Sequence, residues 1–110
     1  MRGHVILSHG LDTSPEATKV RALARVAEGM GWTTERPDYS DIDARGEIGE
    51  VTARLERLLD RAQAAPQPLV LAGSSMGAFI SALASLEVDC VGLFLMAIPP
   101  RSTPSSFLPR

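Results

Sequence analysis

Short apolar runs alternate with stretches of helical periodicity throughout this chain of 110 residues. The runs 4–8, 69–72 and 91–98 suit buried strands, whereas the more polar run 32–39 contains Pro37 and suits an edge strand. Strands that alternate strictly with helices imply a parallel sheet with helices on both faces. We therefore predict an α/β fold, a three-layer sandwich around a parallel sheet of about four strands.

The first helix has clear end signals in the sequence. Ser14 can cap it, Pro15 suits the first helical position, and Glu16 is favourable in the first turn. Gly29 and Gly31 then supply the stop. Apolar residues at helical spacing lie between these signals, at Val20, Leu23, Ala24, Ala27 and Met30.

A second helix is predicted after residues 41–46, and a third over residues 78–86. The second carries one apolar stripe, made of Ile48, Val51, Leu55, Leu58, Leu59 and Ala62. Three arginines recur in the same stretch, at Arg54, Arg57 and Arg61. We interpret this arginine row as a solvent-facing side of the helix.

Composition limits the class of protein. With 45% hydrophobic and 22% charged residues, the chain suits one globular domain. A net charge of −2 and scattered basic residues argue against a nucleic-acid partner. No apolar run approaches the roughly 18 residues of a membrane span, and residues 1–6 are too short for a signal peptide. We therefore expect a soluble, cytoplasmic protein with no membrane partner.

Nothing in the sequence indicates a metal or a cofactor. Cys90 has no zinc-ligand spacing, and we interpret it as a small apolar residue at the start of a buried strand. No G-x-G-x-x-G follows the first strand, and no P-loop ending is present. These absences argue against a dinucleotide or P-loop nucleotide site.

The motif that carries chemistry is Gly73-Ser74-Ser75-Met76-Gly77, which matches G-x-S-x-G. It follows an apolar strand directly and opens a helix, which is the setting of a nucleophile elbow. Such a serine sits on a strained backbone that lifts its hydroxyl clear of the sheet, and the flanking glycines avoid clashes. We predict that Ser75 is a nucleophile; the alternative is a glycine-rich turn without chemistry.

An acyl-transfer site also needs two donors for the developing oxyanion. We expect the backbone N–H groups of Met76, after the nucleophile, and of Leu11, in the first strand–helix loop, to supply them. Gly10 permits a close backbone approach in that loop, and we place Gly10 and Ser74 at the binding site. His9-Gly10 taken alone is also compatible with an ordinary turn.

The segments HVILSHGLDTSP and LVLAGSSMGA together resemble the α/β-hydrolase superfamily, most closely its small, lidless bacterial members of the esterase type. The resemblance covers residues 4 to about 100. It implies a serine hydrolase that acts on a small-molecule ester or related acyl bond, and a strand order of second, first, third, fourth. By motif match Ser75 is the nucleophile, Met76 and Leu11 supply the oxyanion hole, and His9 supports the loop.

The chain departs from this family after the nucleophile. Family members supply the triad in the order Ser, Asp or Glu, His. No histidine follows Ser75, and the only acids there, Glu87 and Asp89, fall at the amino end of the fourth strand. We expect residues 1–100 to be the amino-terminal part of a hydrolase domain, and residues 101–110 to be a disordered or aberrant tail left by truncation or frameshift.

His9 is the one candidate in this chain for a base toward Ser75, with Asp12 or Asp38 to orient its ring. His4 begins the first strand, at the opposite end of the sheet, and is excluded. The resemblance therefore implies a serine hydrolase, with the acid and base of the triad missing from this chain.

Two further hypotheses stay open. The helix N-termini after His9 and Ser75 could make a non-catalytic module that binds an anion or small molecule. The apolar strand 91–98 at a sheet edge invites pairing, so we also expect a homodimer through that strand, aggregation, or covering sequence. No feature of the sequence identifies the substrate.

Overall fold

The computed structural model describes residues 2–11, 14–44 and 50–96. In chain order its elements are β1 (His4–Ser8), α1 (Thr18–Gly29), β2 (Thr33–Glu35), α2 (Ser40–Asp43), α3 (Glu50–Ala64), β3 (Leu69–Ser74), α4 (Met76–Ala84) and β4 (Gly92–Met96). Predictions that concern Asp12, Ile48 and residues 97–110 lie outside the described residues.

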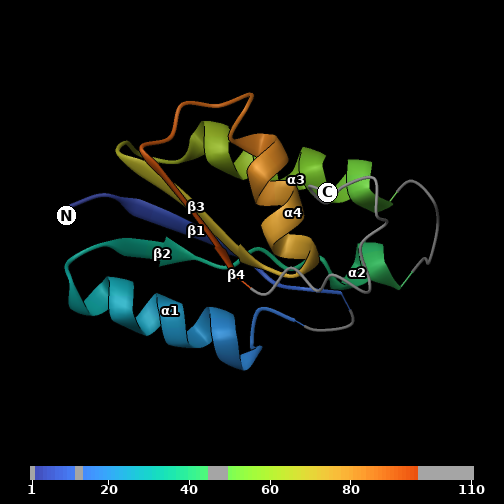
Figure 1. The fold of residues 1–110 in the computed structure, drawn as a ribbon, viewed down its shortest axis with the longest axis horizontal. Helices are drawn as coiled ribbons and strands as arrows, with labels where there is room; N and C mark the ends of the chain where they lie inside the picture. The colour runs from blue at the N-terminus through green and yellow to red at the C-terminus, as the bar shows by residue number, and fades with distance from the viewer. Residues whose placement is uncertain (1, 12–13, 45–49, 97–110) are drawn as a thin grey trace, which may run out of the picture.

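The strands form one parallel sheet in the order β2-β1-β3-β4. In the register, His4 lies opposite both Thr33 and Leu69, and Ser74 lies opposite Met96. Figure 1 shows α1 on one face of the sheet and α3 with α4 on the other. The predicted α/β class, three layers and strand order are confirmed.

Alternation along the strands separates two cores. Ile6 of β1 and Leu71 of β3 point toward α3 and α4, where Leu58 and Ile80 complete a fully buried cluster. Their sequence neighbours point to the opposite face and pack against α1; this second cluster contains Val5, Leu7, Val20, Ala24 and Ala72. Because successive strand residues point to opposite faces, both faces of the sheet are apolar and helices pack on each of them.

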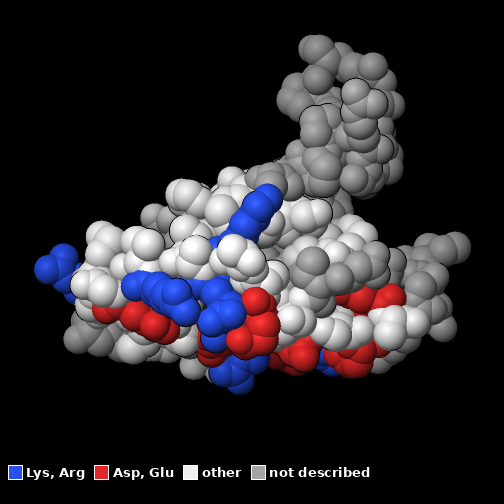
Figure 2. Space-filling model, turned by 90° about the horizontal axis from the view of Figure 1, so that it is seen from below, with Lys and Arg blue, Asp and Glu red and all other residues white. Residues whose placement is uncertain are grey.

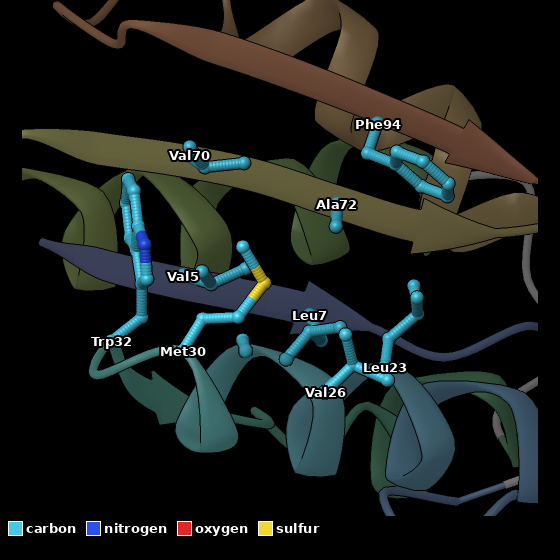
Figure 3. Close-up of a pocket in the computed structure, with 10 residues that line it drawn as sticks. Val5, Leu7, Leu23, Val26, Met30, Trp32, Val70, Ala72 and Phe94 are labelled. Atoms are coloured by element: carbon cyan, nitrogen blue, oxygen red, sulfur yellow. The ribbon is translucent and has the colours of Figure 1, made fainter.

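The α1 face is covered only in part. Figure 3 shows α1 below β1 and β3, with an open apolar groove that continues to Phe94 on β4. The groove has a volume of about 420 Å³. Phe94 remains 52% exposed and its neighbours Leu93 and Leu95 remain 41% and 39% exposed. The predicted apolar edge strand is therefore present and uncovered among the described residues.

The start of α1 differs from the prediction. Ser14 accepts a bond from the Glu16 N–H through its hydroxyl at 3.1 Å, and the Ser14 carbonyl accepts from the Ala17 N–H at 2.9 Å. These bonds close a separate turn, and the helix begins at Thr18 after the extended residue Ala17, whose ψ is 144°. Gly31 has a φ of +90°, the left-handed conformation that ends the helix as predicted.

The polar strand is shorter than predicted, and a short helix follows it. The strand β2 is an edge strand, as expected, but ends at Glu35. Asp38 then accepts a bond from the Ser40 N–H at 2.8 Å, and this local turn leads into the four-residue helix α2. Tyr39, predicted to end the strand, is instead fully buried beside α2.

The later boundaries also shift. Strand pairing continues to Ser74, two residues beyond the predicted end of the third strand, and α4 begins at Met76 rather than Ala78. Within the predicted run 91–98, β4 covers Gly92–Met96. Cys90 precedes this strand and is half-buried against the core, so its interpretation as the start of a buried strand was wrong in its position and in the burial of β4.

The arginine row on α3 does not share one environment. Arg57 and Arg61 lie toward solvent and pair with Asp41 and Glu35, whereas Arg54 is 0% exposed. The interpretation of Arg54 as solvent-facing was therefore wrong. Position 54 lies four residues before Leu58 and eight before Ala62, which places it on the buried stripe of the helix.

Basic and acidic side chains are interleaved on the face seen in Figure 2. Among the ion pairs of the described residues, Glu16 lies 3.8 Å from Arg21 and 3.7 Å from Arg36. None of the described helices is long and apolar enough to cross a membrane. Within residues 2–11, 14–44 and 50–96, no cluster of three or more His, Cys, Asp or Glu side chains could hold a metal ion.

Candidate functional site

Ser75 has the most unusual backbone of the described chain. It lies between the last residue of β3 and the first residue of α4, with φ 59° and ψ −121°. Ser75 is the only described residue other than glycine with a positive φ. A side chain held in this conformation is strained, and such strain concentrates at functional sites. The backbone turns so sharply here that the hydroxyl stands at the carboxyl end of the sheet.

The glycines on either side of Ser75 have no room for a side chain. A Cβ at Gly77 would lie 1.9 Å from the Ser8 carbonyl oxygen. A Cβ at Gly73 would lie 2.3 Å from the carbonyl group of Gly77. Each obstacle is backbone, which cannot rotate away. The elbow therefore requires glycine at both positions, for the reason that the sequence motif indicated.

The first loop lies directly against the elbow. A Cβ at Gly10 would be 3.0 Å from Ser75 Cβ and 3.6 Å from Ser75 Oγ, so glycine permits the close approach. A pocket of about 350 Å³ opens here; its walls include Leu11, Ser74, and Lys19 from the first turn of α1. The structure thus brings together the loop and the motif that the sequence placed apart.

The two expected oxyanion donors lie at this junction. Met76 is the first residue of α4, and the first N–H groups of a helix have no acceptor within it. Bonding within the helix begins with the N–H groups of Ala78 and Phe79, which both donate to the Ser75 carbonyl oxygen. Leu11 is 38% exposed and lines the pocket with Ser75. Met76 and Leu11, the two residues expected to supply oxyanion donors, therefore lie at the same junction as Ser75.

His9 is buried, and both of its ring nitrogens are engaged. Nε2 accepts the Tyr39 backbone N–H at 2.8 Å, which requires Nδ1 to carry the proton that it donates to the Gly10 carbonyl oxygen at 2.8 Å. Burial lowers the pKa of His9, with the charge of Arg54 acting in the same direction. The hydrogen bond to Gly10 opposes that change. In this geometry neither nitrogen offers a free lone pair to the Ser75 hydroxyl.

Asp38, one of the two residues expected to orient His9, lies 3.7 Å from Nε2. Its carboxylate is 61% exposed and bonds to Ser40, and that bonding lowers the pKa of Asp38. The other expected partner, Asp12, lies outside the described residues. The contact at Nε2 comes from the Tyr39 N–H, so Asp38 does not hold the ring as the acid of a triad would.

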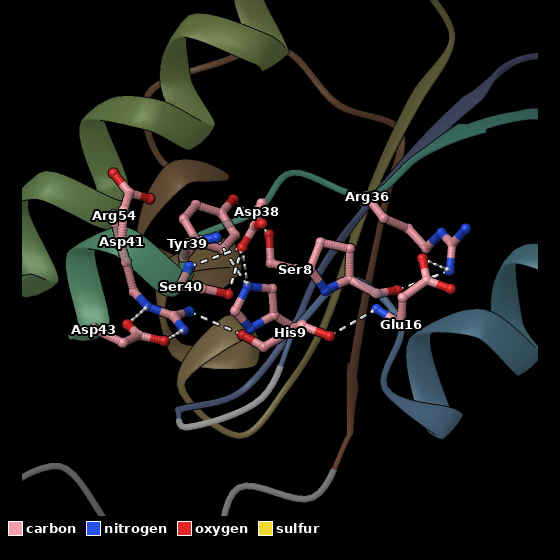
Figure 4. A network of polar contacts seen from close by, with 12 residues as sticks. Ser8, His9, Glu16, Arg36, Asp38, Tyr39, Ser40, Asp41, Asp43 and Arg54 are labelled. Atoms are coloured by element: carbon pink, nitrogen blue, oxygen red, sulfur yellow. Dashed lines mark hydrogen bonds and ion pairs between the residues drawn. The ribbon is translucent and has the colours of Figure 1, made fainter.

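A buried polar network that the sequence analysis did not predict surrounds the loop after β1 (Figure 4). Asp43 accepts two bonds from Arg54, at 2.7 Å from Nε and 2.6 Å from Nη2. The guanidinium lies 4.6 Å from the centre of the Tyr39 ring. Tyr39 in turn bonds to Ser8 at 2.9 Å, and burial raises the pKa of Tyr39 to about 12. The buried-stripe position of Arg54 was the sequence signal that could have found this network.

The remaining titratable candidates lie at the other end of the sheet. Glu87 and Asp89 are exposed before β4, where the Asp89 carbonyl oxygen accepts a bond from Gln67 at 3.0 Å. His4 begins β1, with Nδ1 2.7 Å from Thr33 Oγ1 and Nε2 3.3 Å from Glu35 Oε2. These positions agree with the expected exclusion of all three residues from the elbow.

No protein-family model and no curated protein matches the chain. The crystal structure of a putative hydrolase of the alpha/beta superfamily from Xanthomonas campestris pv. campestris is similar at 56% sequence identity and a TM-score of 0.83. The match covers 86% of this chain and 58% of that chain. The chain therefore spans less than two thirds of the length of that solved structure.

Proposed function

Since this chain belongs to the α/β-hydrolase superfamily over the part of the fold that it spans, we propose that it carries the nucleophile and oxyanion hole of a carboxylic-ester hydrolase. The observation that carries the proposal is the Ser75 backbone, at φ 59° and ψ −121° between β3 and α4. A turn that merely joined a strand to a helix would not need a strained serine between two glycines without room for a Cβ.

The chemistry follows from the position of each group. The Ser75 oxygen attacks the carbonyl carbon of an ester, and the carbonyl oxygen gains negative charge as the tetrahedral intermediate forms. The N–H groups of Met76 and Leu11 donate to that oxygen. Collapse of the intermediate expels the alcohol and leaves an acyl-serine, which water then hydrolyses to the acid.

The Ser75 proton needs a general base that the described residues do not offer at the elbow. Both nitrogens of His9 are engaged, and His4 lies at the amino end of β1. The sequence contains two histidines, and neither follows Ser75, so we assign no residue of this sequence to the base or the acid of a triad.

A fluorophosphonate probe tests the proposal, because it forms a covalent bond with a serine whose attack an oxyanion hole assists. The chain is incubated with the probe, and the mass of the adduct is read beside two variants, Ser75→Ala and Ser74→Ala. The two serines are sequence neighbours, but Ser74 lies in regular strand. Because the described residues offer no base, we expect slow formation of an adduct, assisted by the oxyanion hole alone, in the chain and in Ser74→Ala, and none in Ser75→Ala. An adduct that persists in Ser75→Ala contradicts the assignment of the nucleophile.

A second candidate function is anion binding without catalysis, and the composition of the pocket favours it. Thr18, Lys19 and Val20, the first turn of α1, line the same pocket as Ser75 at the start of α4. Two helix N-termini and one cation would attract a phosphate or a carboxylate. A rise in thermal midpoint with inorganic phosphate, together with no adduct at Ser75, would favour this function over hydrolysis.

A further inference from the structure

Two buried donors hold the Gly10 carbonyl oxygen from one side. Arg54 Nη2 donates to it at 3.1 Å, and His9 Nδ1 donates to it at 2.8 Å. Arg54 Nη1 also donates to the preceding carbonyl oxygen, that of His9, at 2.8 Å. One guanidinium therefore draws two successive carbonyl groups of the first loop toward itself.

The direction of a carbonyl determines the direction of the N–H that follows it. In a planar trans peptide the two groups point opposite ways. The Gly10–Leu11 peptide is trans, because the one cis bond in the described part of the chain joins Gln67 to Pro68. The Leu11 N–H must therefore point away from Arg54. Leu11 also lines the pocket beside Ser75.

We propose that Arg54 is a positioning residue that aims the Leu11 N–H into the oxyanion hole by holding the Gly10 carbonyl in place. The inference rests on the proposed function, because it gives a role to a donor of that site. Donors on a carbonyl also polarise the peptide and strengthen its N–H as a donor. Arg54 thus acts on the oxyanion hole through the backbone, without touching the substrate.

The surroundings of Arg54 suit this role. Its side chain is 0% exposed, and the paired carboxylate of Asp43 is 5% exposed. The two bonds to Asp43 leave the remaining N–H groups of the planar guanidinium directed at the loop (Figure 4). A lysine ammonium cannot hold one carboxylate and two carbonyls with this fixed geometry. The arginine therefore fixes the loop to α3 and α2 at once.

The test compares the chain with a double variant, Asp43→Leu with Arg54→Met. The double change leaves no buried carboxylate unpaired, and apolar replacement of a buried ion pair is often tolerated. Arg57→Met is the matched control, because Arg57 lies one turn along the same helix but pairs with Asp41 at the surface. For each protein we measure fluorophosphonate labelling of Ser75 across probe concentrations, and the amide-proton shift and hydrogen-exchange rate of Leu11.

In the double variant we expect the limiting rate of labelling to fall about 10²-fold, because a shift of about 1 Å in a positioning group can cost that much. The half-saturating probe concentration should not change. The Leu11 amide signals should change, while Arg57→Met should match the unmodified chain in both measurements. A folded double variant with the unmodified limiting rate and unmodified Leu11 signals overturns the inference.

Two other results also decide the question. If the unmodified chain is not labelled, the proposed function fails, and the Leu11 signals alone test the inference: no change in the double variant overturns it. If the double variant does not fold, Arg54→Lys replaces it. A lower limiting rate in Arg54→Lys, at an unchanged half-saturating concentration, supports the inference, and an unmodified limiting rate overturns it.

Discussion

The β2 side and the β4 side of the sheet differ in what covers them. On the β2 side, Tyr39 and Arg54 are fully buried, and the surface charges are paired, as in the contact of Glu35 with Arg61. On the β4 side, Phe94 is 52% exposed and an apolar groove runs from α1 to the strand (Figure 3). Both sides end in a parallel strand, but side chains cover the β2 side and leave the β4 side exposed.

The difference bears on how the proposed site is supported on its two sides. The first loop is anchored on the β2 side by Arg54, and the elbow is joined to β4 by one backbone bond, from the Ser75 N–H to the Met96 carbonyl oxygen at 3.1 Å. In the proposed function, the nucleophile and the oxyanion donors come from the loop after β1 and the elbow after β3. The described residues of the β4 side supply no acid or base to that elbow.

Gly77, at the junction between the two sides, should tolerate substitution least. Gly77→Ala places a Cβ 1.9 Å from the Ser8 carbonyl oxygen, so β1 and α4 must separate. We expect destabilisation of more than about 3 kcal/mol, the upper end for overpacking, and little folded protein. Urea unfolding followed by circular dichroism measures the effect.

Gly29→Ala is the control for the glycine substitution. Its Cβ would meet no heavy atom within 4 Å, and Gly29 ends α1 with no positive φ. Alanine there should stabilise the fold by about 0.5–1 kcal/mol, because it restricts the unfolded chain. Similar free energies of unfolding for the two variants would contradict the close packing of the elbow.

A pair of aromatic truncations compares the two sides directly. Tyr39→Ala removes a fully buried ring and the partner of the Ser8 hydroxyl, so we expect a loss of about 3–5 kcal/mol. Phe94→Ala removes a ring that is 52% exposed, and we expect a loss of about 1 kcal/mol. Equal losses in urea unfolding would mean that the β4 side is covered in solution.

Much of this contrast can be predicted from the sequence. The apolar run at 4–8 and the glycines around Ser75 determine the strands and the elbow, because burial and steric exclusion act on each residue locally. The burial of Arg54 was not predicted, because the prediction rested on its charge. Its helical position indicates burial, since Leu58 lies one turn away on the same buried stripe. The helix α2 could not be predicted, because its four residues depend on the turn at Asp38 and on burial of Tyr39.

Association through β4 gives the next test. We expect the chain to form a homodimer in which the edge strands pair and bury Phe94 and its neighbours. Phe94→Lys should weaken the dimer at least about tenfold, or 1.4 kcal/mol, because it places a charge in the contact. Leu86→Lys is the control, since Leu86 is 83% exposed outside the strand. Sedimentation of the unmodified chain as a monomer at high concentration would exclude this interface.

The smallest expected effect concerns pH and belongs to the β2 side. The folded chain keeps His9 neutral, because burial holds the pKa of His9 below its ordinary value of 6.5. As the pH falls below 6.5, the unfolded chain therefore takes up the proton first, and the free energy of unfolding decreases. Bonds to Ser40 lower the pKa of Asp38, and Arg57 lowers the pKa of Asp41 to about 2, so these two carboxylates titrate in a lower range.

His9→Asn isolates this contribution, because every other titrating group is common to the two chains. Asparagine retains a donor for the Gly10 carbonyl oxygen but does not titrate. We expect the unmodified chain to lose stability between pH 7 and pH 5 more steeply than the variant, measured by urea unfolding at each pH. Parallel curves would mean that the unfolded and folded chains protonate His9 alike. The His9 ring would then be less enclosed by Tyr39 and Arg54 than its 1% exposure indicates. The contrast between a covered β2 side and an uncovered β4 side would not hold.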